Sequence, residues 1–230
     1  MAWPLPDRCV LGIFARRPDP GLVKTRLADS LGDEGAAAAH EAMLLDLAEI
    51  WGSSSVLADG GRRVLAYSPA DAGPWFDERV ASTWSLVPQG DGDLGTRMRA
   101  FFDGEFADGA ERVVLIGSDA PTLDPSLVVS AFLCLEGRDL VLGPAADGGY
   151  YLVGCRGLTA PIFEGVDWGS EQVLSQTIGR LQGMSTTLSV LPPWYDVDRP
   201  EDWRALRGHI AAMRRAGLDP RLPRVEALLK

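Results

Sequence analysis

Short apolar runs alternate with longer amphipathic segments along the chain. The short runs are rich in valine, leucine and isoleucine, which is typical of strands buried inside a parallel sheet. They predict strands at Cys9–Ala15, Arg63–Tyr67, Trp84–Pro88, Arg112–Ile116, Leu140–Gly143, Tyr150–Gly154 and Thr187–Leu191. The run at Tyr150–Gly154 is expected to pair with a nearby strand, and antiparallel pairing is one option.

The amphipathic segments have helical spacing, because their apolar residues recur on one face of a helix. They predict helices at Asp33–Trp51, Asp93–Phe106, Pro125–Leu135, Ser170–Leu181 with Ser170 as its cap, and Pro200–Gly217. Leu218–Lys230 is either a tail or a last short helix. Strands that alternate with helices predict βαβ units, and therefore an α/β protein whose mostly parallel sheet carries helices on both faces. Without a low-complexity linker, we expect one domain over residues 1–230.

Composition narrows the class of protein. Apolar residues make up 46% of the chain, enough for a real core, and the net charge of -10 disfavours nucleic-acid binding. No apolar stretch approaches the roughly 20 residues that span a bilayer. Three widely spaced cysteines, Cys9, Cys134 and Cys155, predict buried thiols in a reducing cytoplasm. With only two histidines, a histidine-based zinc site or catalytic triad is not expected.

Asp119 is the most informative polar residue. It comes just after the buried run Arg112–Ile116, and open α/β sheets bind ligands beyond the carboxyl ends of their strands. A carboxylate at that place can hold a divalent cation, and the cation can hold a diphosphate. A turn or a helix cap is the alternative, because Pro121 and Thr122 follow.

A basic loop follows the first predicted strand. Backbone amides near Gly21, together with Arg16, Lys24 and Arg26, are candidates to grip a diphosphate. The alternative is a solvated basic loop. A second candidate phosphate contact lies at Gln89–Met98, where Gly95 permits close approach of a ligand and Arg97 falls in the first turn of a helix. A turn with a helix cap explains that segment equally well.

Two further acidic segments follow later strands. Asp147 and Tyr150 lie in a glycine-rich stretch that is either a plain hairpin turn or a contact with an acceptor substrate. Asp196 and Asp198 point to one side of an extended backbone, so that one of them can supply a second metal ligand opposite Asp119. Capping of the helix at Pro200 by Asp198 is the alternative. Trp168 is one of three tryptophans near turns that are able to stack on a ring, although core packing is commoner.

Five stretches in this order resemble one bacterial family: FARRPDPGLVKTRL, GDLGTRM, GSDAP, GPAADGGYYLVG and DVDRPED. The resemblance runs from about Val10 to Trp203 and is to the DUF2064-type glycosyltransferases, also called radical-SAM/selenodomain-associated transferases, of the nucleotide-diphospho-sugar transferase superfamily. It implies a Rossmann-like GT-A fold, a nucleotide-diphospho-sugar donor, and Mg²⁺ or Mn²⁺ bridging an aspartate and the donor. Asp119 matches the metal-binding aspartate. The usual Asp-x-Asp is incomplete, because residue 121 is proline.

The resemblance implies a metal-assisted transferase, with sugar transfer to an unknown acceptor ranked first. Asp147, with Tyr150, would then approach the acceptor and accept a proton from its hydroxyl. The DVDRPED stretch is also similar to nucleotidyltransferases that release pyrophosphate, although their glycine-rich first loop is absent. A third reading, motivated by the incomplete Asp-x-Asp, is a nucleotide-binding module without catalysis.

Overall fold

A computed structural model describes residues 8–54, 61–157 and 161–229. The strands within these ranges are β1 (Cys9–Arg16), β2 (Arg62–Ser68), β3 (Ser85–Pro88), β4 (Arg112–Gly117), β5 (Leu140–Pro144), β6 (Tyr150–Arg156) and β7 (Leu188–Val190). The α-helices are α1 (Ala28–Gly52), α2 (Gly73–Arg79), α3 (Leu94–Ala107), α4 (Pro125–Cys134), α5 (Val173–Gly179), α6 (Pro200–Arg215) and α7 (Pro223–Leu228). A short 3-10 helix, η2 (Ala70–Ala72), precedes α2.

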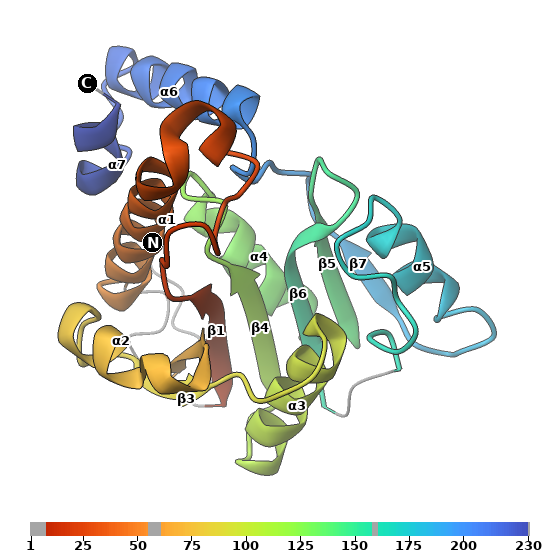
Figure 1. Cartoon of the computed structure of the whole chain (residues 1–230). Helices are drawn as coiled ribbons and strands as arrows, with labels where there is room; N and C mark the ends of the chain where they lie inside the picture. The colour runs from red at the N-terminus through yellow and green to blue at the C-terminus, as the bar shows by residue number, and fades with distance from the viewer. Residues whose placement is uncertain (1–7, 55–60, 158–160, 230) are drawn as a thin grey trace.

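All these strands join one sheet, in the order β3-β2-β1-β4-β6-β5-β7 (Figure 1). β1 lies between β2 and β4 and is parallel to both, with Ile13 opposite Leu65 and Ile116. β6 is antiparallel to β4 and β5. The predicted α/β class and mostly parallel sheet are therefore confirmed, and the antiparallel option holds for β6. The consequence is that the carboxyl ends of β1 and β4 meet at one edge, together with the β5–β6 turn.

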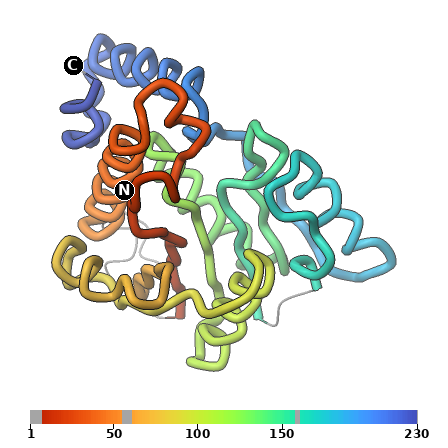
Figure 2. Tube along the Cα trace, viewed as in Figure 1, coloured from red at the N-terminus to blue at the C-terminus, as the bar shows by residue number. Residues whose placement is uncertain are grey.

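Helices cover both faces of the sheet, because strand side chains alternate between them. On one face, Leu11 and Ile13 of β1 share a core with Met43 of α1 and Phe132 of α4. On the other face, Val10 shares a core with Phe102 of α3. At the C-terminal end, α7 returns to lie against α1 (Figure 2). There the buried Asp46 carboxylate accepts hydrogen bonds from the backbone N–H groups of Arg224 and Val225 in α7.

The helix boundaries show where local sequence signals were weak. α2 was not predicted, because its seven residues begin with Gly73 and Pro74, which suggest a turn; burial of Phe76 stabilises it. The first helix begins earlier than predicted, at Ala28, but Gly32 interrupts it with φ of 69°. Ser170 lies in the turn before α5 and is not its N-cap, which is Gln172. The last short helix is present as α7.

Cys9, Cys134 and Cys155 are free thiols, but Cys134 is half-buried where full burial was predicted. Among the described helices, none combines the length and the apolar character needed to cross a membrane.

Candidate active site

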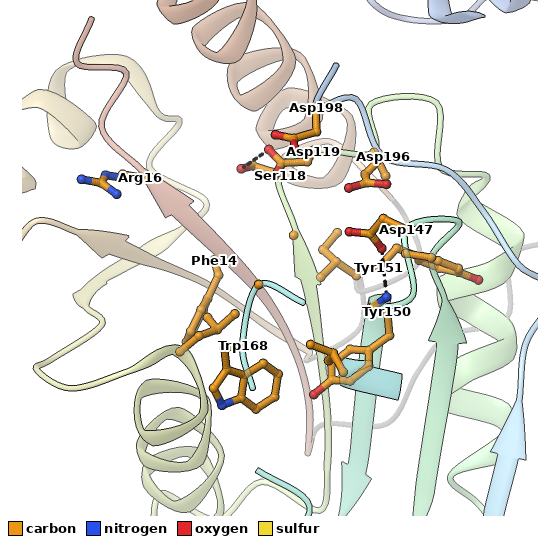
Figure 3. A pocket seen from close by; sticks show the side chains of 18 of the residues that line it. Phe14, Arg16, Ser118, Asp119, Asp147, Tyr150, Tyr151, Trp168, Asp196 and Asp198 are labelled. Atoms are coloured by element: carbon orange, nitrogen blue, oxygen red, sulfur yellow. Dashed lines mark hydrogen bonds between the residues drawn. The ribbon is translucent and has the colours of Figure 1, made fainter. Parts of the chain in front are cut away.

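A cleft of about 1180 Å³ opens beyond the carboxyl ends of β1 and β4 (Figure 3). It brings together most of the predicted site residues, which come from segments far apart in the sequence. Those that line it are Arg16, Lys24, Arg26, Arg97, Asp119, Asp147, Tyr150, Asp196 and Asp198. Gly21 and Gly95 are not among its lining residues. The volume is somewhat larger than the roughly 300–1,000 Å³ of most small-molecule sites and suits two substrates.

Lys24 and Asp119, both in the cleft lining, form an ion pair. The Lys24 ammonium nitrogen lies 2.9 Å from Asp119 Oδ2 and 3.6 Å from Asp198 Oδ1. Lys24 is turned inward from a loop with φ of 47°, and the neighbouring Val23 and Leu27 are buried anchors. Its side chain is 5% exposed, whereas that of Asp119 is 41% exposed. The carboxylate is therefore held by the lysine on one side and open to a ligand on the other.

The same pairing sets the charge of Asp119. Loss of solvent around the carboxyl is the largest single effect and would raise its pKa, but the charge of Lys24, together with His40 and hydrogen bonds from Lys24 and Ser118, outweighs it. The pKa of Asp119 is therefore held below its ordinary value. The group stays ionised at neutral pH, as a metal ligand must be.

His40 is a site residue that sequence reasoning missed. Its Nε2 lies 3.0 Å from the carbonyl oxygen of Arg16, so Nε2 carries the proton and donates it. Its Nδ1 lies 3.7 Å from Asp119 Oδ1 and has no hydrogen-bond partner in the part of the chain that the structure describes. Burial lowers the pKa of His40 more than the nearby carboxylate raises it. Its position on the buried face of the helix after the basic loop was the available signal.

Asp147 and Asp196 form a pair of neighbouring carboxylates, separate from the Lys24–Asp119 ion pair. The backbone of Trp194 exchanges hydrogen bonds with Pro144 and Ala146, and this pairing sets the segment after β7 beside the β5–β6 turn. Within the described ranges, neither carboxylate forms an ion pair with a basic residue. Burial, and next the negative charge of Asp147, raise the pKa of Asp196 to about 6. This pair therefore offers negative charge that no ion pair within the described ranges neutralises.

The carboxylates suit a divalent cation only in combination with a substrate. No group of three or more acidic, histidine or cysteine side chains in the described ranges forms a ready-made metal site. Asp119 and Asp196 come close through the hydrogen bond from Val197 N to the Asp119 carbonyl oxygen, 2.8 Å long. Mg²⁺ in nucleotide sites is commonly held by one or two carboxylates plus phosphate oxygens and water. The residues present fit that arrangement.

Asp198 has a different role from the one predicted as the alternative. It pairs with Arg26 at 3.0 Å and more distantly with Lys24. It does not cap α6; the Asp202 carboxylate accepts from the backbone N–H groups of Asp198 and Arg199 instead. The reason is that an acidic residue in the first helical turn reaches back to those N–H groups. With two basic partners, Asp198 is less available to a metal than Asp196.

Three guanidinium groups of the cleft lining have no carboxylate ion pair among the described residues: Arg16, Arg97 and Arg199. Arg97 is oriented by Gln89, whose amide nitrogen donates to the carbonyl oxygens of Ala15 and Ala66. The side-chain oxygen of Gln89, Oε1, is thereby fixed toward Arg97 and accepts a hydrogen bond from Arg97 Nη1 at 2.9 Å. Unpaired guanidinium groups are strong candidates for phosphate contacts.

The remaining predicted residues have structural surroundings that constrain their roles. Gly95 lies in the first turn of α3, which Asp93 caps, and a Cβ there would collide with the Phe163 carbonyl oxygen and the Trp168 ring. Gly21 has φ of 74° in the basic loop. Tyr150 packs edge-on against Trp168, with ring centroids 6.2 Å apart, and its hydroxyl is buried. Burial raises the pKa of that hydroxyl, so the ring suits a wall better than a proton donor.

The substitution Asp196→Asn is expected to stabilise the ligand-free protein. The folded-state pKa of about 6 exceeds the ordinary aspartate value of 3.8, so the folded protein binds this proton more tightly than the unfolded chain does. Wild-type stability therefore falls as pH rises between these values. Above pH 6 the variant should gain about 1–2 kcal/mol in free energy of unfolding, after allowance for solvent screening.

Urea unfolding in the presence of a chelator measures this difference. It should shrink as the pH falls from 6 and disappear near pH ~3, below both pKa values, where Asp196 is mostly protonated in both states. Asp77→Asn, on the exposed side of α2, is the matched control and should show no such pH-dependent gain. A variant that is no more stable than wild type at pH 7 would contradict the pairing of the Asp147 and Asp196 carboxylates.

Comparison with solved structures places the fold. A crystal structure from Desulfovibrio desulfuricans G20, provisionally named a nucleotide-diphospho-sugar transferase, is 30% identical, covers 97% of each chain and superposes with a TM-score of 0.84. A cytidylyltransferase from Leptospira borgpetersenii is 15% identical over 96% of this chain and 93% of its own, with a TM-score of 0.56. CMP:2-keto-3-deoxy-manno-octonic acid synthetase in complex with CTP is 12% identical over 89% of this chain and 99% of its own, with a TM-score of 0.54.

The fold is therefore the Rossmann-like fold of transferases that act on nucleotides and nucleotide sugars, as the sequence resemblance predicted. A family model described as "Uncharacterized protein conserved in bacteria (DUF2064)" matches residues 53–170, more than half of the chain. The chain belongs to this family. No curated protein matches it.

Proposed function

We propose that this protein is a metal-assisted glycosyltransferase that moves a sugar from a nucleotide-diphosphate donor to a hydroxyl acceptor. One observation carries the proposal: the unpaired guanidinium groups of Arg16 and Arg97 line the same cleft as the open carboxylates of Asp119 and Asp196. Cations for phosphate and carboxylates for a metal are the two requirements of a bound diphosphate. The 30% identity to a protein provisionally named a nucleotide-diphospho-sugar transferase supports it.

The donor would be held by charge at its diphosphate. Arg16, Lys24 and Arg97 would contact the phosphate oxygens, and Gln89 keeps Arg97 in place by the hydrogen bonds described above. Asp119 and Asp196 would hold Mg²⁺ or Mn²⁺, which would neutralise the diphosphate as it leaves. Asp198 would serve mainly to hold Lys24 and Arg26. Gly21 would let the basic loop turn, with its amides near the phosphates.

The acceptor would be activated at Asp147. One of its carboxylate oxygens accepts a hydrogen bond from Gly149 N at 2.9 Å, which fixes the side chain in the turn. The other carboxylate oxygen would take the proton from the acceptor hydroxyl. At the same time the oxygen of that hydroxyl would form a bond to the anomeric carbon of the sugar. The bond from this carbon to the diphosphate oxygen breaks, and its electron pair leaves with the nucleoside diphosphate. Tyr150 would form a wall beside the reacting groups.

Nucleotidyl transfer is the second candidate, and the Lys24–Asp119 contact favours it. An ammonium beside a metal carboxylate places positive charge where a triphosphate carries most of its negative charge. In that reaction a phosphate oxygen of the second substrate bonds to the α-phosphorus of a nucleoside triphosphate. The bond from this phosphorus to the bridging oxygen then breaks, and pyrophosphate leaves.

Product analysis separates these candidates. The protein is incubated with UDP-glucose, UDP-galactose or GDP-mannose, and separately with CTP, UTP or GTP plus sugar 1-phosphates, each with Mn²⁺, Mg²⁺ or a chelator. Release of nucleoside diphosphate that depends on the metal supports glycosyl transfer. Release of pyrophosphate instead supports nucleotidyl transfer. Nucleotide binding without either product would mean that the fold is kept for binding alone.

A further inference from the structure

The cleft has an aromatic end that the phosphate and metal residues do not occupy. In Figure 3, Phe14, Trp168 and Tyr150 lie together below the aspartates. They come from β1, from the loop before α5 and from the start of β6. Apolar side chains complete this part of the lining: Leu94, Met98, Leu115 and Val153. We call Phe14, Tyr150 and Trp168, with these four residues, the aromatic end.

The Trp168 ring is held firmly in this position. It packs edge-on against Tyr150 and at a tilt against Phe163, with ring centroids 6.2 Å and 6.4 Å away. Gly95 lets the indole approach the first turn of α3, because any larger residue there would collide with it. The ring is therefore a fixed wall of the cleft, and it is only half-buried.

The loop that carries Trp168 is also fixed relative to Asp147. Leu174 N donates to the Gly148 carbonyl oxygen at 2.9 Å. Gly148 has φ of 93°, and a Cβ at this glycine would lie 2.8 Å from the Glu171 Cα. The two backbones thus pack directly on each other. The aromatic wall and the carboxylate that would accept the proton form one unit.

The charge of the aromatic end indicates what fits there. No member of it is ionised at neutral pH, and the guanidinium of Arg97, which also lines the cleft, is turned toward Gln89. Flat aromatic walls favour a ring with an apolar face. We propose that the aromatic end is the acceptor subsite and takes a neutral hydroxylated ring, packed on Trp168 and Tyr150 with one hydroxyl reaching Asp147. This inference rests on the proposed function, because it assigns the acceptor of that reaction.

Binding of small ring compounds tests the subsite without any turnover. Saturation-transfer NMR is recorded with methyl β-D-glucopyranoside, with phenol, and with the open-chain glycerol. Both ring probes should receive saturation from the wild-type protein, and glycerol should not. The ring probe with the stronger saturation-transfer signal indicates whether the acceptor is a sugar or a phenol. In Trp168→Leu the ring signals should fall roughly fivefold, whereas Trp168→Phe should retain most of them.

Trp75→Leu is the matched control, because Trp75 packs on Phe76 outside the cleft lining and its loss should leave the probe signals unchanged. Thermal unfolding checks that each variant is folded. Equal signals in wild type and Trp168→Leu, or equal signals for glycerol and the rings, would overturn the proposal. So would displacement of the ring probes by UMP or CMP, since the surface would then take the nucleobase. Ring binding that requires Trp168, in a protein that turns over no nucleotide sugar, would support the subsite and count against the proposed reaction.

Discussion

Replacing Asp119 with alanine is expected to abolish metal-dependent nucleotide binding and to lower turnover by on the order of 1,000-fold, because a metal at a leaving diphosphate contributes several kcal/mol. Asp119 is the carboxylate that faces both Lys24 and the open cleft. Calorimetry of UDP binding with and without Mn²⁺ measures the first effect, and product release with the best nucleotide sugar measures the second.

Asp77→Ala is the control for this experiment, because Asp77 is an exposed aspartate on α2 and lies outside the cleft lining. It should bind UDP and Mn²⁺ as wild type does. If Asp119→Ala keeps the Mn²⁺ effect on UDP binding, Asp119 is not a metal ligand. The assignment of the metal to Asp119 and Asp196 would then be wrong.

Replacing Lys24 with methionine should reduce turnover by roughly 100-fold, since removing one donor from a developing negative charge typically has an effect of this size. The loss should appear as weaker UDP binding as well as slower release. Methionine preserves the length and apolar stem of the buried side chain, so the change isolates the charge. Arg26→Met is the comparison, because Arg26 is 57% exposed and its pair with Asp198 is solvent-screened.

The two variants should therefore differ by about tenfold or more in the affinity for UDP. Equal effects of both substitutions would indicate that Lys24 contributes only general positive charge to the loop. A Lys24→Met variant with wild-type affinity would place the diphosphate elsewhere in the cleft. In either case, thermal unfolding of both variants shows whether loss of the buried ammonium also destabilises the basic loop.

Most of the sheet was predictable because its strands are nearly continuous apolar runs. β4, for example, consists of Arg112, four aliphatic residues and Gly117, a pattern with few alternatives. α2 was not predictable for the opposite reason. Its formation depends on burial of Phe76 beneath neighbouring elements, which is a tertiary effect with no periodic signal. The antiparallel direction of β6 also depends on pairing with β4, so the sequence left it open.

The placement of site residues followed from one rule, that ligands bind beyond the carboxyl ends of strands. That rule found Asp119 and the basic loop, and the acidic segments after later strands, all of which reach the cleft. It gave no information on which charges pair. The contact of Lys24 with Asp119, and of Arg26 with Asp198, depends on how distant loops meet. For the same reason it did not anticipate that Asp198 would be occupied by basic partners while Asp196 has none among the described residues.

Gln89 and His40 were the hardest site residues to predict. Gln89 fixes Arg97 by bonding to carbonyl oxygens of two adjacent strands, and this requires knowledge of the sheet order. His40 lies on the buried, alanine-rich face of α1, which is a signal of burial, but its approach to Asp119 depends on how α1 meets the end of β4. Both contacts exist only once the strands and helices are assembled.

The tight backbone contact between Gly148 and the loop at Glu171 has a consequence for engineering. A protein designer who wishes to change the second substrate cannot remodel either loop alone, because moving one backbone displaces the other. The second substrate can instead be changed by replacing exposed aromatic and aliphatic side chains while both loops and their glycines are kept.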